Sequence, residues 1–265
     1  MVKFISFGSG SSGNCYYLNC NGYGLLIDAG VGIRVFKKLY KDYGLSFNEI
    51  NALLITHDHY DHVKAVGAVS HNFKVSVYAT AAVHGGIQRN YKVHRKVDAE
   101  FRQSISHGEA MQFGPFCVTA FAVPHDSSGN TGYFIEADGV RFALITDAGC
   151  ITDSIRHYVA KANYLVVEAN YEDSMLEQGS YPQNLRNRIR SPKGHLANHE
   201  TGELLAGSAT ADLRRVWLCH LSEENNTPAV ALATVAGRIK ESAGEVHYTI
   251  EALNRRSPSG IYELE

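Results

Sequence analysis

The run His57-Asp58-His59-Tyr60-Asp61-His62 directly follows the apolar stretch Ala52-Leu53-Leu54-Ile55-Thr56. This stretch predicts a buried strand over 52–56 that delivers the run to the edge of a sheet. Imidazoles and carboxylates gathered without a thiolate favour zinc, manganese or iron over a structural zinc knot. A loop there can aim His57 and His59 to one side and Asp61 and His62 to another, which suits two ions about 3.5–4 Å apart.

Composition narrows the class of protein. The chain has 265 residues, 45% of them hydrophobic, and a formal net charge of −2. This charge argues against a protein that coats nucleic acid over its whole surface, so a polyanion needs a local patch. The apolar segments are too short for a secretory signal or a membrane span. The five cysteines are scattered, which favours a reducing, cytoplasmic setting.

Hydrophobic periodicity predicts alternating strands and helices along the chain. We expect strands at 2–7, 15–19, 24–28, 52–56, 75–78, 116–123, 131–137, 140–146, 163–168, 214–219 and 245–250. Helices are expected at 31–41, 61–71, 80–89, 152–161, 198–208 and 228–241, with helical pieces in 172–190. The order predicts an α/β fold in which two mixed sheets pack face to face with helices on the outer surfaces. We expect one domain over 1–265.

Three further candidate ligands each follow a strand-like run. His125 follows Thr119–Pro124, Asp147 follows Phe142–Thr146, and His220 follows Val216–Cys219. Each is unremarkable alone, since Asp is a common turn residue. Together they supply enough donors to complete two coordination spheres.

This pattern resembles the metallo-β-lactamase superfamily, and the likeness covers essentially the whole chain. The superfamily fold is an αβ/βα sandwich, in agreement with the predicted element order. The resemblance implies that His57, His59 and His125 hold one metal, that Asp61, His62 and His220 hold a second, and that Asp147 bridges them around a shared hydroxide nucleophile. Asp28, in Leu26-Ile27-Asp28-Ala29-Gly30, resembles the aspartate that braces the metal loops.

A narrower likeness rests on short motifs. Ser6–Cys15, Glu168-Ala169-Asn170, Lys193–Asn198 and His220-Leu221-Ser222 resemble a bacterial subgroup called YycJ-type or WalJ-like proteins. That resemblance implies a 5′→3′ DNA exonuclease linked to DNA repair. The gap of 73 positions from Asp147 to His220 is too short for the large cap domain of related nucleases.

A basic segment suggests how a phosphodiester is held. Residues 186–195 read Arg-Asn-Arg-Ile-Arg-Ser-Pro-Lys-Gly-His, and a face of this kind can contact phosphates. We expect Arg186, Arg188, Arg190 and Lys193 to bind the DNA backbone without reading bases. The other interpretation is a solvated face paired with Glu172, Asp173 and Glu177. Gly194 and His195 are expected to begin a helix, an anion site.

The sequence therefore predicts a cytoplasmic phosphodiesterase with two divalent ions, zinc or manganese or else iron. In this hypothesis Asp61 both binds metal and accepts a proton, and His195 contacts the scissile phosphate or protonates the leaving oxygen. An alternative is a small-molecule hydrolase on the same site: a cyclic phosphodiesterase, a lactonase or a thioesterase. A second alternative is a non-catalytic metal-binding regulator, which the intact ligand set disfavours.

Overall fold

A computed structural model describes residues 1–265 and contains two seven-stranded sheets. The first sheet has the order β14-β1-β2-β3-β4-β5-β6. Its strands β3, β4, β5 and β6 run parallel, whereas β14, β1, β2 and β3 pair antiparallel. The bounds are β1 Val2–Gly8, β2 Cys15–Cys20, β3 Tyr23–Ile27, β4 Ile50–Leu54, β5 Ser76–Ala79, β6 Arg102–Ser104 and β14 Tyr262–Leu264.

The second sheet has the order β13-β12-β11-β10-β9-β8-β7. Here β7 to β10 pair antiparallel, and β10 to β13 pair parallel. The bounds are β7 Ala110–Phe113, β8 Phe116–Ala122, β9 Thr131–Ala137, β10 Val140–Ile145, β11 Tyr164–Glu168, β12 Arg215–Cys219 and β13 Thr249–Ala252. Both sheets are thus mixed, as the sequence predicts.

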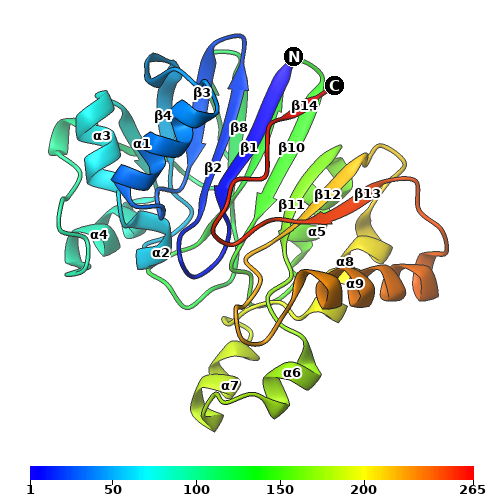
Figure 1. Ribbon diagram of the computed structural model, residues 1–265. Helices are drawn as coiled ribbons and strands as arrows, with labels where there is room; N and C mark the ends of the chain where they lie inside the picture. Colours follow the sequence, from blue (N-terminus) through cyan, green and yellow to red (C-terminus); the bar gives the residue numbers. More distant parts are fainter.

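Helices cover the outer face of each sheet, and α6 and α7 project beyond the sheets at the lower end (Figure 1). Beside the first sheet lie α1 Ile33–Asp42, α2 Tyr60–Val63, α3 Val66–Phe73 and α4 Ala81–Arg89, with short 3₁₀ turns at Phe47–Glu49 and Ala99–Phe101. The later helices are α5 Asp153–Lys161, α6 Asp173–Gln178, α7 Gln183–Ile189, α8 Asn198–Ser208 and α9 Pro228–Ala243. No helix is long and apolar enough to cross a membrane.

Alternating side chains build three apolar layers. Along β1, Phe4 points between the sheets, whereas Ile5 and Phe7 point toward the helices beside the first sheet. Between the sheets, the Phe4 ring lies 4.8 Å from Trp217 and 5.1 Å from Phe142, centroid to centroid. This two-residue period is what a strand buried on both faces requires. The αβ/βα sandwich predicted from the sequence is therefore confirmed.

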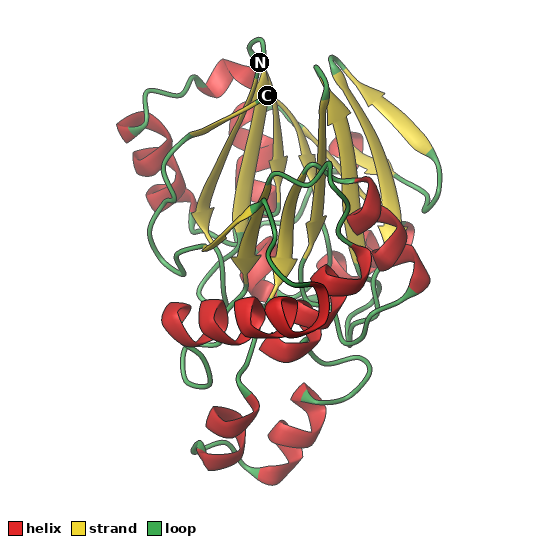
Figure 2. Ribbon diagram, turned by 90° about the vertical axis from the view of Figure 1, so that its right-hand side faces the viewer, coloured by secondary structure: helices red, strands yellow, loops and turns green.

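The packed sheets bring many strand ends to one edge. Strands β1, β3 and β4 run in the same direction in the first sheet, as do β8, β10, β11 and β12 in the second. Their carboxyl ends lie together at the lower end of both views, whereas the two chain termini lie at the opposite end (Figures 1 and 2). Loops at this edge of open α/β sheets commonly form ligand sites.

Several predicted elements need correction. The helix expected at 61–71 is interrupted between α2 and α3, because Ala29 N donates to His62 O at 2.7 Å and Ala65 N donates to Ala29 O at 2.8 Å. The strand expected at 245–250 is β13 at Thr249–Ala252. Short strands β6, β7 and β14 were missed, since three or four residues carry too little periodicity to detect.

Candidate metal centre

His57, His59 and His125 form the first histidine group at this edge. One ring nitrogen from each lies within 4.8 Å of the others. His57 and His59 belong to the loop after β4, and His125 comes from the loop after β8. His125 Nδ1 faces Gly194 O at 2.9 Å, which fixes the ring and leaves Nε2 toward His59 Nδ1 at 3.3 Å. Residues separated by more than sixty positions thus meet as the sequence predicts.

A second group contains Asp61, His62 and His220. Asp61 Oδ2 lies 3.6 Å from His62 Nε2 and 3.4 Å from His220 Nε2. Asp147 lies between the groups: its Oδ2 is 3.2 Å from His62 Nε2, and its Oδ1 is 3.7 Å from His125 Nε2. The seven predicted ligands therefore converge, and the position of Asp147 suits a carboxylate shared by two ions.

Asp28 supports this centre from beneath. The buried carboxylate accepts hydrogen bonds from Thr56 N and Thr56 Oγ1, both at 2.8 Å, and its Oδ2 lies 2.7 Å from His62 Nδ1. The Nδ1–H of His62 therefore faces Asp28, and Nε2 is the ring nitrogen turned toward the centre. A carboxylate behind a histidine commonly orients it as a metal ligand. The bracing position expected for Asp28 agrees with these contacts.

The hydrogen bonding of His57 indicates whether these residues fit a metal ion. Its Nδ1 lies 3.0 Å from Thr56 Oγ1, whose own proton goes to Asp28. Its Nε2 is buried and has no hydrogen-bond partner. Burial, together with the neighbouring His62, holds the pKa of His57 well below its ordinary value, so the ring is neutral. A buried, neutral imidazole nitrogen without a partner is costly in a protein and suits a cation ligand.

Glu168, in the motif Glu168-Ala169-Asn170, is a site residue whose role the sequence alone does not predict. It ends β11 and is fully buried. Its Oε1 lies 2.7 Å from His195 Nδ1 and 3.0 Å from His220 Nδ1, while Oε2 accepts from Ala148 N at 2.7 Å. The signal that singled out Asp147 and His220, an ionisable residue at the end of an apolar run, was also present here.

The electrostatics of this half of the centre follow from these contacts. Burial opposes the charge on His220, but Asp147, Asp61 and Glu168 outweigh it and raise its pKa to about 10. Burial likewise opposes charge on His195, yet Glu168 and Asp147 raise the pKa of that ring. The pKa of Glu168 is lowered because His195 and His220 outweigh its burial. In the metal-free chain these residues are thus a network of charged pairs.

The backbone bends sharply to reach the centre. Asp28, Asp147 and His220 have positive φ values of 62°, 53° and 52°. A side chain in this left-handed region costs about 1–3 kcal/mol, which is tolerated where the surroundings hold it and is common at functional sites. Each bend comes just after a strand, so the side chain turns back over the sheet edge.

The Gly8–Asn14 loop packs against Asp61 and His62, two of the candidate metal ligands. Asn14 Nδ2 lies 2.9 Å from His62 Nε2 and 3.3 Å from Asp61 Oδ2, and Asn14 N donates to Asp61 O at 2.8 Å. Gly30 makes this approach possible, because a Cβ there would lie 1.5 Å from Asp61 O. Asn14 was also missed, since an asparagine in a Gly-rich loop looks like an ordinary turn residue.

A cavity of about 160 Å³ opens beside the centre. His195, His220 and Arg188 line it, together with Ser11, Asp126, Asn170, Tyr181, Leu185, Ile189, Gly194 and Ser222. The helix expected to begin at Gly194-His195 begins at Asn198 instead, because Gly194 N and His195 N bond back to Ser191 O and Ile189 O. His195 therefore stands in a loop that reaches the cavity.

Three of the four basic residues that are expected to bind phosphate, Arg186, Arg190 and Lys193, do not line this cavity. Arg190 Nη1 lies 2.8 Å from Glu177 Oε2, and Arg186 Nη1 lies 3.4 Å from Glu177 Oε1. Arg188 bonds Asp126, which places its guanidinium at the cavity. Lys193 is exposed and does not line the cavity. Of the predicted phosphate-binding residues, the structure brings only Arg188 and His195 to the centre.

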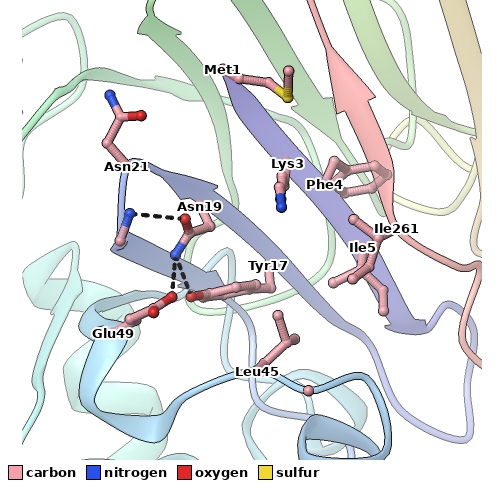
Figure 3. Close-up of a pocket in the computed structure, with 12 residues that line it drawn as sticks. Met1, Lys3, Phe4, Ile5, Tyr17, Asn19, Asn21, Leu45, Glu49 and Ile261 are labelled. Carbon is pink, nitrogen blue, oxygen red and sulfur yellow. Dashed lines mark hydrogen bonds between the residues drawn. The ribbon is translucent and has the colours of Figure 1, made fainter.

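A larger cavity, of about 410 Å³, lies elsewhere on the first sheet. Figure 3 shows its wall, where the Asn19 amide donates to Tyr17 Oη and to Glu49 Oε2, both at 2.9 Å. Its lining contains no histidine or aspartate, and its one carboxylate is already bonded. The donor set, rather than cavity size, therefore identifies the candidate site.

Comparison with known proteins supports this assignment. A model of the "Beta-lactamase superfamily domain" matches residues 23–221. The chain is 30% identical to "Exodeoxyribonuclease YycJ" of Bacillus anthracis, covering 94% of this chain and 95% of that protein. It is 31% identical to "Exodeoxyribonuclease WalJ" of Streptococcus pneumoniae, covering 91% and 89%. The structure of Zn²⁺-bound PqqB from Methylobacterium extorquens superposes with a TM-score of 0.73 at 17% identity, covering 99% and 100%.

Proposed function

The chain belongs to the metallo-β-lactamase superfamily and is a metal-dependent hydrolase, and on this premise we propose that it is a phosphodiesterase that degrades DNA from its 5′ end. One observation carries the proposal. Arg188 and His195 line the same small cavity as His220, a candidate metal ligand. A cation and a proton donor beside a metal centre suit a phosphodiester, which develops negative charge on its oxygens during cleavage. The exodeoxyribonuclease relatives support the same substrate.

Two divalent ions fit the donor set. One ion would be held by His57, His59 and His125. The other would be held by Asp61, His62 and His220, and Asp147 would contribute to both. When bound, such a pair lowers the pKa of a water molecule and neutralises phosphoryl oxygens. Zinc, manganese and iron all suit histidine and carboxylate donors.

The protein's own residues supply the remaining steps. Asp61, whose pKa is lowered because His62 and His220 outweigh its burial, stays ionised and accepts a proton from the attacking water. His195 Nδ1 is held by Glu168, so Nε2 is the atom that faces the cavity and protonates the leaving sugar oxygen. The raised pKa of His195 favours the protonated ring that this role requires. Arg188 holds the phosphate without reading a base.

Metal content and substrate together test this proposal. Protein purified without chelator should hold two transition-metal ions per chain and release nucleotides from 5′-labelled DNA with manganese or zinc. Asp147→Gly should lose both ions and this activity, because glycine accepts the φ of 53° while the carboxylate is removed. The matched control is Asp138→Gly, at an exposed turn with a φ of 49°.

Two results would contradict the proposal. A wild-type chain that holds at most one ion after reconstitution would exclude the binuclear centre. A metal-loaded chain that cleaves small esters or cyclic diesters but leaves DNA intact would identify a small-molecule hydrolase instead.

A further inference from the structure

A group of exposed cations without carboxylate partners lies outside the 186–193 segment. Arg34 and Lys38 on α1 and Lys64 after α2 are exposed, and none of them forms an ion pair with a carboxylate. Lys64 contacts only the Tyr60 ring through its ammonium, at 5.7 Å from the centroid. In the 186–193 segment, by comparison, Arg186 and Arg190 pair with Glu177 and Arg188 pairs with Asp126, which leaves the exposed Lys193 without a carboxylate partner. The α1 region therefore carries three unpaired cations, Arg34, Lys38 and Lys64, whereas the 186–193 segment carries one.

One of these cations, Lys64, lines a groove at the start of α1, which we call the basic groove. It has a volume of about 160 Å³ and is lined by Lys64, Arg255 and Arg256 together with Phe7, Gly8, Ser12, Gly13, Val31, Gly32 and Val35. A Cβ on Gly32 would lie 3.8 Å from Lys64 Cε, so the lysine stem packs along the start of α1. Arg34 follows Gly32 by two positions, and Lys38 is one turn further along α1.

Arg255 fixes the far wall of this groove. Its guanidinium donates to Leu221 O at 2.9 Å and to Asn226 O at 2.8 Å, and forms no ion pair. Carbonyl partners hold the side chain in place without cancelling its charge. Its neighbour Arg256 lies 2.8 Å from Glu223 and so contributes less.

The basic groove and the candidate active site lie on two sides of one loop. Ser11 lines the cavity beside His220, and the next two residues, Ser12 and Gly13, line the basic groove. Asn14 then contacts His62 and Asp61. A strand that leaves the active-site cavity across Ser11 therefore reaches Lys64 and α1 after crossing a single loop.

We propose that the basic groove binds the phosphate backbone of the DNA strand beyond the nucleotides held at the metal centre. This inference rests on the proposed function and adds a second subsite to it. A nucleic acid backbone is the polyanion favoured, because Lys64 and Arg255 line a groove that is separated from the reaction site by a single loop. A membrane surface is less suitable, since Val35 is the only large apolar side chain exposed among the residues that line it. Contacts of this kind are independent of base sequence.

The test compares two triple variants with matched charge loss. Arg34→Gln/Lys38→Gln/Lys64→Gln removes Lys64 from the groove wall and two further cations from the adjoining helix α1. Arg156→Gln/Lys161→Gln/Lys240→Gln is the control, because these residues are also exposed and free of ion pairs but lie on α5 and α9. The probe is a fluorescent single-stranded oligonucleotide with phosphorothioate linkages, which resist hydrolysis, and binding to metal-loaded protein is followed by anisotropy over a range of salt.

The groove variant should bind this probe about tenfold more weakly at low salt, and the slope of log K against log salt should flatten by about 2, because each phosphate contact on a single strand contributes about 0.7. The ratio of kcat/KM for a long oligonucleotide to kcat/KM for a dinucleotide should fall only in this variant. Equal behaviour of the two variants, while wild-type protein degrades DNA, would overturn the groove proposal alone. Displacement of the probe by vesicles of phosphatidylglycerol, which bind wild type but not the groove variant, would instead identify a membrane-binding face.

Discussion

The carboxylate of Glu168 contacts His195 Nδ1 at 2.7 Å, and the same oxygen lies 3.0 Å from His220 Nδ1. One buried group thus orients both a candidate metal ligand and the proposed proton donor. Its other oxygen is already held by Ala148 N at 2.7 Å and Leu196 N at 3.3 Å, so it has little freedom to reorient. A change at Glu168 should therefore act through two histidines at once.

We predict that Glu168→Gln lowers kcat for DNA by about 10²–10⁴-fold, the usual contribution of a proton donor. Without the carboxylate, the pKa of His195 should fall, and the optimum of the pH–rate profile should move to lower pH. His195→Ala should impair DNA cleavage far more than cleavage of a p-nitrophenyl diester, whose leaving group needs no proton. Glu200→Gln is the matched control, since that glutamate accepts a bond from Ala197 N at 2.8 Å as a helix cap. Equal losses on both substrates would show that His195 holds the phosphate instead.

Asp28 offers a prediction about metal affinity. Asp28→Asn keeps a side chain that tolerates a φ of 62° but weakens the acceptor behind His62 and Thr56. Metal affinity should fall by about 10–100-fold, as is typical when a group behind a ligand is changed. Competition with a chromophoric chelator would measure this loss, with Asp138→Asn as the control. Unchanged affinity would mean that Asp28 supports only the fold.

The features of the fold and of the candidate site that follow local sequence rules could be predicted. Candidate ligands such as His125 and Asp147 were predictable because each follows an apolar run, and strands of one direction end at one sheet edge. The pairing of Arg190 with Glu177 was an open alternative, whereas that of Arg188 with Asp126 joins residues 62 positions apart and depends on how two loops pack. The unpaired state of the cations beside α1 could not be predicted for the same reason, because a sequence does not show which acidic residues lie near each cation in the fold.

The metal-free protein should lose stability as the pH rises. The folded pKa of His220, about 10, lies above the ordinary value of 6.5. A raised pKa contributes stability that is fully present below pH 6.5 and is lost as the pH rises to about 10, with a slope of at most about 1.4 kcal/mol per pH unit. Thermal unfolding of chelator-treated protein between pH 6.5 and pH 10 would measure this slope.

Metal ions should reverse this dependence, because a ligand histidine must release its proton before it binds a cation. The stabilisation that zinc or manganese adds should therefore grow over the same pH window. His220→Asn tolerates the φ of 52° and should weaken both effects. A metal-free Tm that stays flat in wild type over this range would show that His220 is not paired with Asp147 and Glu168 as described.

Two arginines of the 186–193 segment, Arg188 and Arg190, should differ in their contribution to DNA binding. Arg188 lines the active-site cavity and bonds Asp126, so Arg188→Ala should raise KM for DNA about tenfold through loss of one charged phosphate contact. Arg190 instead pairs with Glu177 on the exposed rim, where removal of an ion pair costs about 0–1 kcal/mol of stability. Arg190→Ala should therefore leave KM within about twofold of wild type. Steady-state kinetics on 5′-labelled DNA would compare them, with circular dichroism to verify folding. If both variants raise KM alike, the segment contacts DNA as a whole, and the phosphate-binding role predicted for Arg186, Arg190 and Lys193 would stand.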